Sequence, residues 1–221
     1  MIAEEIDYMT AIESLPRGAS LVFPYTTWED YEAVLKELEE RSRFRVNYYK
    51  GKLTVMSPLP VHKEYKDTIF RLACVLAEEL DIEMETRGST TFRRKIKESG
   101  VEPDTCFYVQ HAQNLIGQRT IDLDFDPPPD VVVEIDNTTD SENKFKIYAA
   151  LGVPELWFYD KSEVHFFKLK NNSYIEIKKS IAFSLLTPYL LKDFIEQSKT
   201  TGQTAMLKAF RKRIKKELKS K

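Results

Sequence analysis

The feature that most constrains the fold is the stretch 130–160, which reads as strand, turn, helix and strand. Val131, Val132 and Val133 lead directly into Glu134, and an apolar run of this kind is typical of a strand buried on both faces. A carboxylate inside such a strand is costly unless it is paired or bound. Glu134 therefore needs a partner that the rest of the chain must supply.

The helix expected after this strand offers a candidate partner. Thr139 and Glu142 have the capping-box spacing, so the helix is expected to begin near residue 140, and Gly152 is placed to end it. The spacing i, i+3, i+4 and i+7 defines one face of this helix, and that face carries Lys144, Ile147, Tyr148 and Leu151. Only Lys144 is charged, so a lysine on the inward face follows a buried glutamate.

Composition narrows the class of protein. The chain has 221 residues, 42% apolar and 31% charged, with a net charge of −2, which argues against a globally basic nucleic-acid binder. Cys74 and Cys106 lie within apolar patterns and are interpreted as small buried hydrophobes. Residues 1–16 are acidic and lack the apolar core of a signal peptide, and no apolar run is long enough to span a membrane. We expect a cytoplasmic protein with no membrane partner.

Strands alternate with helices along the chain, which predicts an α/β fold with helices on the faces of a sheet. Helices are expected at 27–42, 61–80, 140–151 and 189–197. Strands are expected at 44–49, 52–56, 83–86, 90–94, 105–109, 131–135, 156–159, 164–168 and 174–178. The pairs 44–49 with 52–56 and 164–168 with 174–178 have hairpin spacing.

Three polar residues are expected to converge in this fold. Asp104 follows Pro103 at the start of a strand that we expect beside the strand of Glu134, and Lys144 projects from the helix that packs across them. Two neighbouring carboxylates repel each other unless a cation lies between them. Oxygen ligands suit magnesium or manganese, and a nearby lysine can orient or deprotonate an attacking water. Together these groups indicate hydrolysis of a phosphodiester.

Several motifs carry a family resemblance. They are the segments 51–62, 102–104, 130–134, 144–148 and 152–157. The ordered set resembles the Uma-two family, a group assigned as restriction endonucleases within the PD-(D/E)XK nuclease superfamily, over about residues 25–190. The resemblance implies a restriction-endonuclease-like core, with a mixed central sheet flanked by helices, to which this chain adds an N-terminal helix and hairpin. It also implies bound Mg²⁺ (or Mn²⁺) and endonuclease chemistry on nucleic acid, with DNA as the first candidate.

The resemblance assigns roles residue by residue. Asp104 matches the aspartate of the Pro-Asp motif and Glu134 the following acidic residue, both as metal ligands, and Lys144 matches the lysine that this family carries on the next helix. Asp136 stands where the superfamily usually has its lysine, and Asn47 where the family often has a carboxylate. These two departures favour an alternative, a catalytically inactive nucleic-acid-binding or protein-interaction module. A phosphoester hydrolase acting on another substrate is a third interpretation.

Each candidate also has a purely structural interpretation. Asp104 could form a turn before its strand, and Glu134 with Lys144 could be a buried ion pair. Asp136 is typical of a turn or cap, although its side chain could share the face of Glu134. His62, near the start of a helix, and Tyr148, one turn after Lys144, are candidate supporting residues that could equally be structural, as could His111 and His165, which carry no motif.

The C-terminal segment is a basic amphipathic helix. An apolar stripe runs through it, formed by Leu207, Phe210, Ile214 and Leu218. It could contact phosphates, dock on the domain with a solvated outer face, or bind a membrane surface, for which nothing else in the chain argues. We divide the chain into an arm at 1–24, a nuclease-like domain at 25–200 and this helix at 201–221, and by analogy expect a homodimer.

Overall fold

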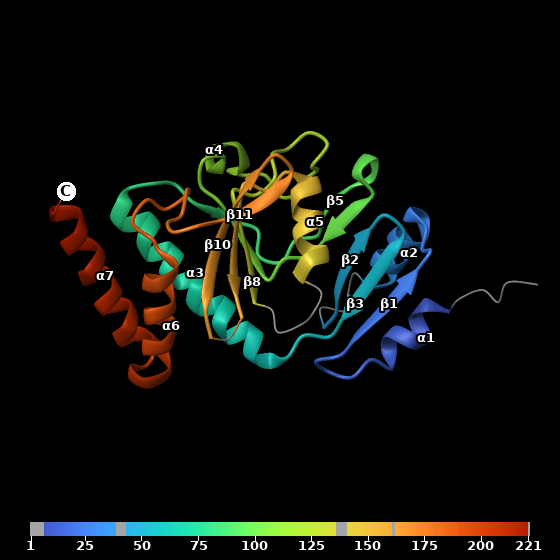
Figure 1. The fold of residues 1–221 in the computed structure, drawn as a ribbon, viewed down its shortest axis with the longest axis horizontal. Coiled ribbons are helices and arrows are strands. Elements are labelled where there is room, and N and C mark those ends of the chain that lie inside the picture. Colours follow the sequence, from blue (N-terminus) through green and yellow to red (C-terminus); the bar gives the residue numbers. More distant parts are fainter. Residues whose placement is uncertain (1–6, 39–42, 136–140, 161, 221) are drawn as a thin grey trace, which may run out of the picture.

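The structure is a computed structural model that describes residues 7–38, 43–135, 141–160 and 162–220, without the side chains of residues 60–62 and 141. Its described residues form a six-stranded sheet and a five-stranded sheet with helices packed around them. Figure 1 shows the five-stranded sheet at one end of the molecule and the C-terminal helices at the other. The mixed α/β class predicted from the sequence is confirmed.

The six-stranded sheet is mixed. In spatial order it consists of β11 (Ser173–Ile177), β10 (Val164–Lys170), β9 (Glu155–Tyr159), β8 (Val131–Ile135), β7 (Thr105–Tyr108) and β4 (Glu85–Thr86). Only β8 and β9 pair in parallel, and the other neighbours are antiparallel. Because parallel neighbours need a crossover connection, the helix α5 (Ser141–Leu151) runs between them, as the stretch 130–160 predicted.

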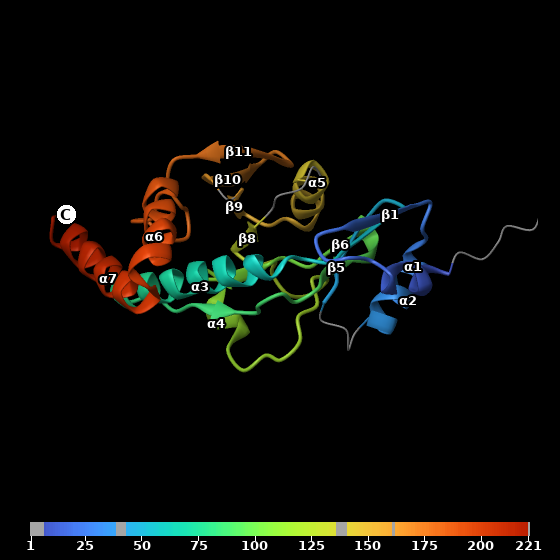
Figure 2. The ribbon, with the colours of Figure 1, turned by 90° about the horizontal axis from the view of Figure 1, so that it is seen from below.

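Helices cover both faces of this sheet. On one face lie α3 (Pro60–Leu80), α6 (Pro188–Thr201) and α7 (Gln203–Lys219), and on the other lies α5. Figure 2 shows α3 and α5 on different sides of β8. Val131, Val133 and Ile135 pack into the α3-side core, whereas Val132 packs into the α5-side core. Since strand side chains alternate, Glu134 shares the α5 side with Val132.

The second sheet is antiparallel. Its order is β1 (Ser20–Pro24), β3 (Lys52–Met56), β2 (Arg45–Tyr49), β6 (Ser99–Val101) and β5 (Phe92–Arg94). The helices α1 (Tyr8–Glu13) and α2 (Trp28–Leu38) contribute to its core. The predicted hairpin of β2 and β3 is confirmed, and it turns at Lys50 and Gly51, whose φ angles of 46° and 81° suit a tight two-residue turn. Short pieces elsewhere are the 3₁₀ turn Lys95–Lys97 and α4 (Ala112–Leu115).

The N-terminal segment differs from the expected arm. Residues 20–24 form β1, which pairs along its whole length with β3. Leu21 and Phe23 pack against the core of the second sheet, and the other positions of β1 are more exposed. This pairing joins strands some thirty residues apart, so no local pattern revealed it. The expected boundaries at residues 24 and 200 stay a prediction.

Three further expectations concern helix α6, the cysteines and membrane-spanning helices. Helix α6 extends beyond the expected 189–197, mainly at its C-terminal end. It begins at Pro188, where the Thr187 hydroxyl caps it by accepting a hydrogen bond from the Leu190 N–H at 3.1 Å. Cys106 is buried and Cys74 half-buried, and both are free thiols. Among the described residues, no helix is both long and apolar enough to cross a membrane.

Candidate active site

The candidate site is built around the carboxylate of Glu134. Lys144 Nζ donates a hydrogen bond to Glu134 Oε2 at 2.6 Å, and the Tyr148 hydroxyl donates to Oε1. The side chains of Lys144 and Glu134 are only 6% and 3% exposed. Lys144 and Tyr148 reach the same carboxylate because residues four apart lie on one helix face. Both oxygens of the buried glutamate are therefore bonded from α5.

Asp104 reaches the same place from the neighbouring strand. In the antiparallel pairing of β7 with β8, Thr105 lies opposite Val133, so one further step brings Asp104 opposite Glu134. Asp104 Oδ2 also accepts a hydrogen bond from the Ile135 N–H at 2.8 Å, which ties it to the end of β8. The expected neighbour relation between the two carboxylates is thus present in the fold.

Burial dominates the electrostatics of this cluster. It raises the pKa of Glu134 from the ordinary 4.5 to about 7, Lys144 opposes that rise, and the negative charge of Asp104 adds to it. Burial and the adjacent Glu134 raise the pKa of the Tyr148 hydroxyl well above its usual range, so Tyr148 stays a hydrogen-bond donor. The ionised form of Glu134 is stabilised by Lys144, and a further cation would stabilise it more.

The carboxylates of Asp104 and Glu134 are the type of ligand that a magnesium ion prefers. Among the described residues, no group of three or more His, Cys, Asp or Glu side chains could hold a metal ion. A carboxylate pair remains, and magnesium is commonly held by one or two carboxylates with water and substrate oxygens in the other positions. The feature that favours a cation here is the position of Asp104 opposite Glu134 in the β7–β8 pairing, because a cation would offset the repulsion between the two carboxylates.

Two other predicted residues, Asp136 and the side chain of His62, lie outside the part of the chain that the structure describes. The start of α3 does lie at this end of β8, because the Tyr65 ring packs on the Tyr159 ring with centroids 4.9 Å apart, and Tyr159 pairs with Ile135.

The two remaining histidines pair with acids elsewhere. His111 Nδ1 lies 2.6 Å from Asp130 Oδ1, and His165 Nδ1 lies 2.8 Å from Glu176 Oε1. Neither is part of the Glu134 cluster, in keeping with their lack of a motif.

Asn47 has a specific environment on β2. It is 3% exposed, and within the described residues its Oδ1 has no hydrogen-bond partner. Tyr49, two positions further along the strand, packs against the α5-side core, so Asn47 lies on the face of β2 that is turned toward α5. A neutral amide therefore occupies a buried position on the side of β2 that is turned toward α5.

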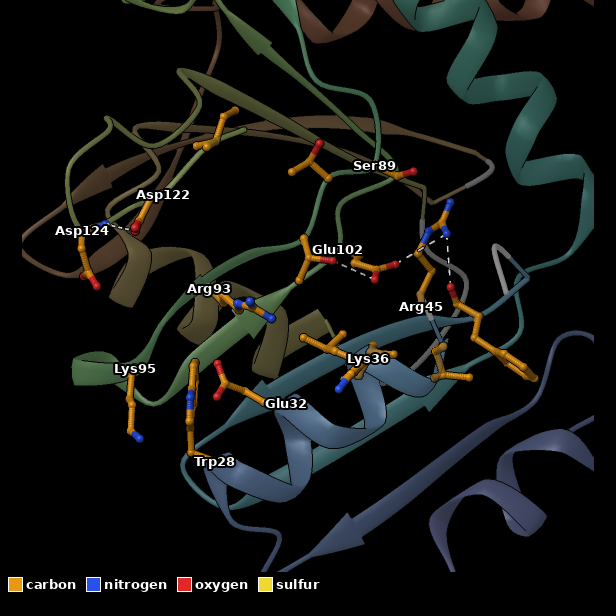
Figure 3. Close-up of a pocket in the computed structure, with 17 residues that line it drawn as sticks. Trp28, Glu32, Lys36, Arg45, Ser89, Arg93, Lys95, Glu102, Asp122 and Asp124 are labelled. Carbon is orange, nitrogen blue, oxygen red and sulfur yellow. Dashed lines mark hydrogen bonds and ion pairs between the residues drawn. The ribbon is translucent and has the colours of Figure 1, made fainter. Parts of the chain in front are cut away.

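A polar groove was not predicted from the sequence. It encloses about 1050 Å³ between α2, β2 and the segments 89–95 and 121–124. Figure 3 shows Arg45, Arg93 and Glu102 along it. Glu102 accepts a hydrogen bond from the Thr91 hydroxyl at 3.0 Å and lies 3.6 Å from Arg45. Because Glu102 is two residues before Asp104, the groove reaches the segment that carries the candidate site. Its lining comes from separate segments, which no local motif could reveal.

Comparison with known proteins agrees with the expected family. No sequence among curated proteins matches the chain significantly. The crystal structure of a "putative nuclease belonging to DUF820" from Anabaena variabilis is similar with a TM-score of 0.44 and 15% identity, over 67% of this chain and 89% of that one. A sequence model of the Uma2 (Uma-two) family, described as "Putative restriction endonuclease", matches residues 28–190, well over half of the chain. The chain belongs to the Uma2 family.

Proposed function

We propose that this protein is a metal-dependent endonuclease that hydrolyses phosphodiester bonds in nucleic acid, with DNA as the first candidate substrate. The observation that carries the proposal is the cluster in which Asp104 lies opposite Glu134 while Lys144 Nζ bonds to Glu134 at 2.6 Å. Membership of a family described as restriction endonucleases supports the same reaction class. Homodimerisation, which would bring two sites to two strands, stays a prediction.

The chemistry divides between the metal and the protein. A divalent cation held by Asp104 and Glu134 would lower the pKa of a bound water and offset charge on the phosphate. Lys144 would orient that water or stabilise the developing negative charge, because its ammonium group already lies at the carboxylate. Tyr148 would hold Glu134 in one orientation through its hydroxyl. The lack of a lysine at position 136 leaves this mechanism intact, because Lys144 of α5 would provide the ammonium group.

One observation favours the alternative of an inactive module. The contact between Lys144 and Glu134 is buried, with side chains 6% and 3% exposed, as in a purely structural ion pair. A structural pair would bind no metal, and replacing it would change stability without changing any reaction. An inactive module would also bind nucleic acid or protein without cleaving it, whichever divalent cation is present.

Cleavage of DNA in Mg²⁺ or Mn²⁺ tests the proposal. Supercoiled plasmid and single-stranded DNA are offered to the wild type and to Asp104→Asn, Glu134→Gln and Lys144→Met. We expect each variant to cleave on the order of a hundredfold more slowly or worse, since each removes a group that acts on the reacting atoms. Lys146→Met is the matched control, because Lys146 lies on the same helix but is exposed.

The outcomes separate the hypotheses. Full cleavage by Lys144→Met would remove the lysine from the mechanism, and full cleavage by both carboxylate variants would remove the site. DNA binding without cleavage in either metal would support the inactive module. Circular dichroism of each variant checks that it is folded.

A further inference from the structure

Helix α7 is attached to the domain through its apolar face. Met206, Phe210 and Ile214 are fully buried against the core beneath α3 and α6. Two acidic residues at the end of α3 strengthen the attachment, because Arg211 bonds to Glu78 and Glu79 at 2.6 Å each. The tail is therefore a docked helix, and Figure 1 shows it at the end of the molecule opposite the second sheet.

The outer face of α7 carries a ridge of lysines, which we call the α7 ridge. It consists of Lys208, Lys212, Lys216 and Lys219, all exposed. At 3.6 residues per turn these four positions fall within about 80° of arc, opposite the buried face. In the described part of the chain, no carboxylate forms an ion pair with any of the four, whereas Arg211, Arg213 and Lys215 are paired with glutamates. The ridge thus concentrates positive charge on a protein whose net charge is −2.

We infer that the α7 ridge binds the phosphate backbone of duplex DNA. The ridge from Lys208 to Lys219 is about 16 Å long at 1.5 Å per residue. A duplex carries one charge per about 1.7 Å of its axis, so it offers about ten phosphates over that length. The aliphatic parts of the ridge side chains, with Arg211 and Lys215, line a hollow of about 600 Å³ between them. The inference rests in part on the proposed function, since it names a surface that holds the same substrate.

The burial of the apolar face argues against a membrane surface as the partner. A helix that binds a membrane must place its apolar side chains among the lipids. In α7 those positions, Met206, Phe210 and Ile214, are already occupied in contacts with the protein. Apart from Leu218, which is 37% exposed, the outer side of α7 is mainly charged, which suits a polyanion.

The ridge is well separated from the Glu134 cluster. Tyr65 of α3 lies at the Glu134 end of β8, whereas Glu79 of the same helix contacts α7. The two positions are fourteen residues apart along α3, which is about 21 Å along the helix axis. Changes on the ridge should therefore leave Mn²⁺ binding at the cluster unchanged.

The experiment measures binding of a labelled 30-base-pair duplex by fluorescence anisotropy in EDTA, over a series of salt concentrations. One variant replaces the four ridge lysines by glutamine, which keeps the helix propensity. The matched control also replaces four lysines by glutamine and so removes the same number of charges. They are Lys168, Lys170, Lys178 and Lys179, which lie on or just after the β10–β11 hairpin. A third variant replaces the four ridge lysines by arginine.

We expect the glutamine variant to bind on the order of tenfold more weakly at 100 mM salt. Its plot of log affinity against log salt should be shallower by up to about 3.6, at about 0.9 per lost phosphate contact. The control and the arginine variant should keep the wild-type slope. An unchanged slope in the glutamine variant, or an equal loss in the control, would overturn the inference.

Two further arms distinguish this inference from the proposed function. If the wild type binds the duplex through the ridge but cleaves nothing, the proposed function fails and the ridge stands. If the wild type cleaves DNA and the ridge variant keeps the wild-type slope, the ridge fails alone. Binding to phosphatidylserine vesicles or to an acidic polypeptide, with no binding to the duplex, would also overturn the assignment to DNA.

Discussion

Metal binding at the candidate site should depend on pH through Glu134. Burial raises the pKa of this carboxyl to about 7, and a protonated carboxyl is a poor metal ligand. Below that pH the cation must displace a proton, so its apparent affinity should fall about tenfold for each further pH unit. Between pH 8 and pH 5.5 we expect Mn²⁺ to bind about thirtyfold more weakly, or by about 2 kcal/mol.

Without metal, the same raised pKa makes the fold more stable at low pH. This is opposite to the pH dependence of metal binding, which is stronger at high pH. A carboxyl whose pKa is higher in the folded state than its ordinary 4.5 stabilises the fold when it is protonated. That contribution is complete below pH 4.5 and is lost as the pH rises through about 7, with a limit on the order of 3 kcal/mol. Mn²⁺ should therefore stabilise the wild type more at pH 8 than at pH 5.5.

Calorimetry in two buffers with different ionisation enthalpies measures both affinity and proton release. At pH 7 the wild type should release about half a proton per Mn²⁺ bound, and Glu134→Gln should bind little Mn²⁺. Glu102→Gln is the matched control, because burial also raises the pKa of Glu102 although it lies outside the cluster. An affinity that is constant from pH 5.5 to pH 8, or a pH dependence that disappears in the Glu102 variant, would refute this reasoning.

Three other predictions concern the buried ion pair, the close contact at Gly100 and the polar groove. Lys144→Met leaves Glu134 without its cation and should lower the free energy of unfolding by about 3–5 kcal/mol, measured by urea denaturation in EDTA; a loss below 1 kcal/mol would contradict the buried pair. Gly100→Ala would place a Cβ 2.0 Å from the Tyr31 hydroxyl and should cost about 1–3 kcal/mol, and the double variant with Tyr31→Phe should recover part of it. Arg93→Ala, in the polar groove, should raise the KM for DNA with little change in kcat, and an unchanged KM would remove the groove from substrate binding.

Local sequence patterns predicted the elements around the site. The turns at Lys50-Gly51 and Asn171-Asn172 have the positive φ angles that such hairpins need. Glu134 within its apolar run indicated a buried strand and a missing partner, and Lys144 on the helix face was the candidate for that partner. Both signals are local, because strand alternation and helix periodicity are properties of short segments.

The remaining features depend on contacts between distant segments. Strand β1 pairs with β3, and the three-residue β6 is held between β2 and β5, so neither has a pattern of its own. Gly100 shows the difficulty, because only the position of the Tyr31 hydroxyl explains why a side chain is excluded there. The polar groove has the same origin, since its lining comes from several elements that meet only in the fold.

The placement of the lysine on α5 has a consequence for the candidate site. A lysine on β8 itself would be held by the hydrogen-bond ladder of the sheet, whereas Lys144 depends on how α5 packs. Ile147 and Leu151, one and two turns further on, anchor the helix in the α5-side core, and Tyr148 bonds to the same glutamate. Side-chain packing therefore holds the ammonium group against the carboxylate, which explains how a chain without a lysine at position 136 can still bring an amine to the carboxylates.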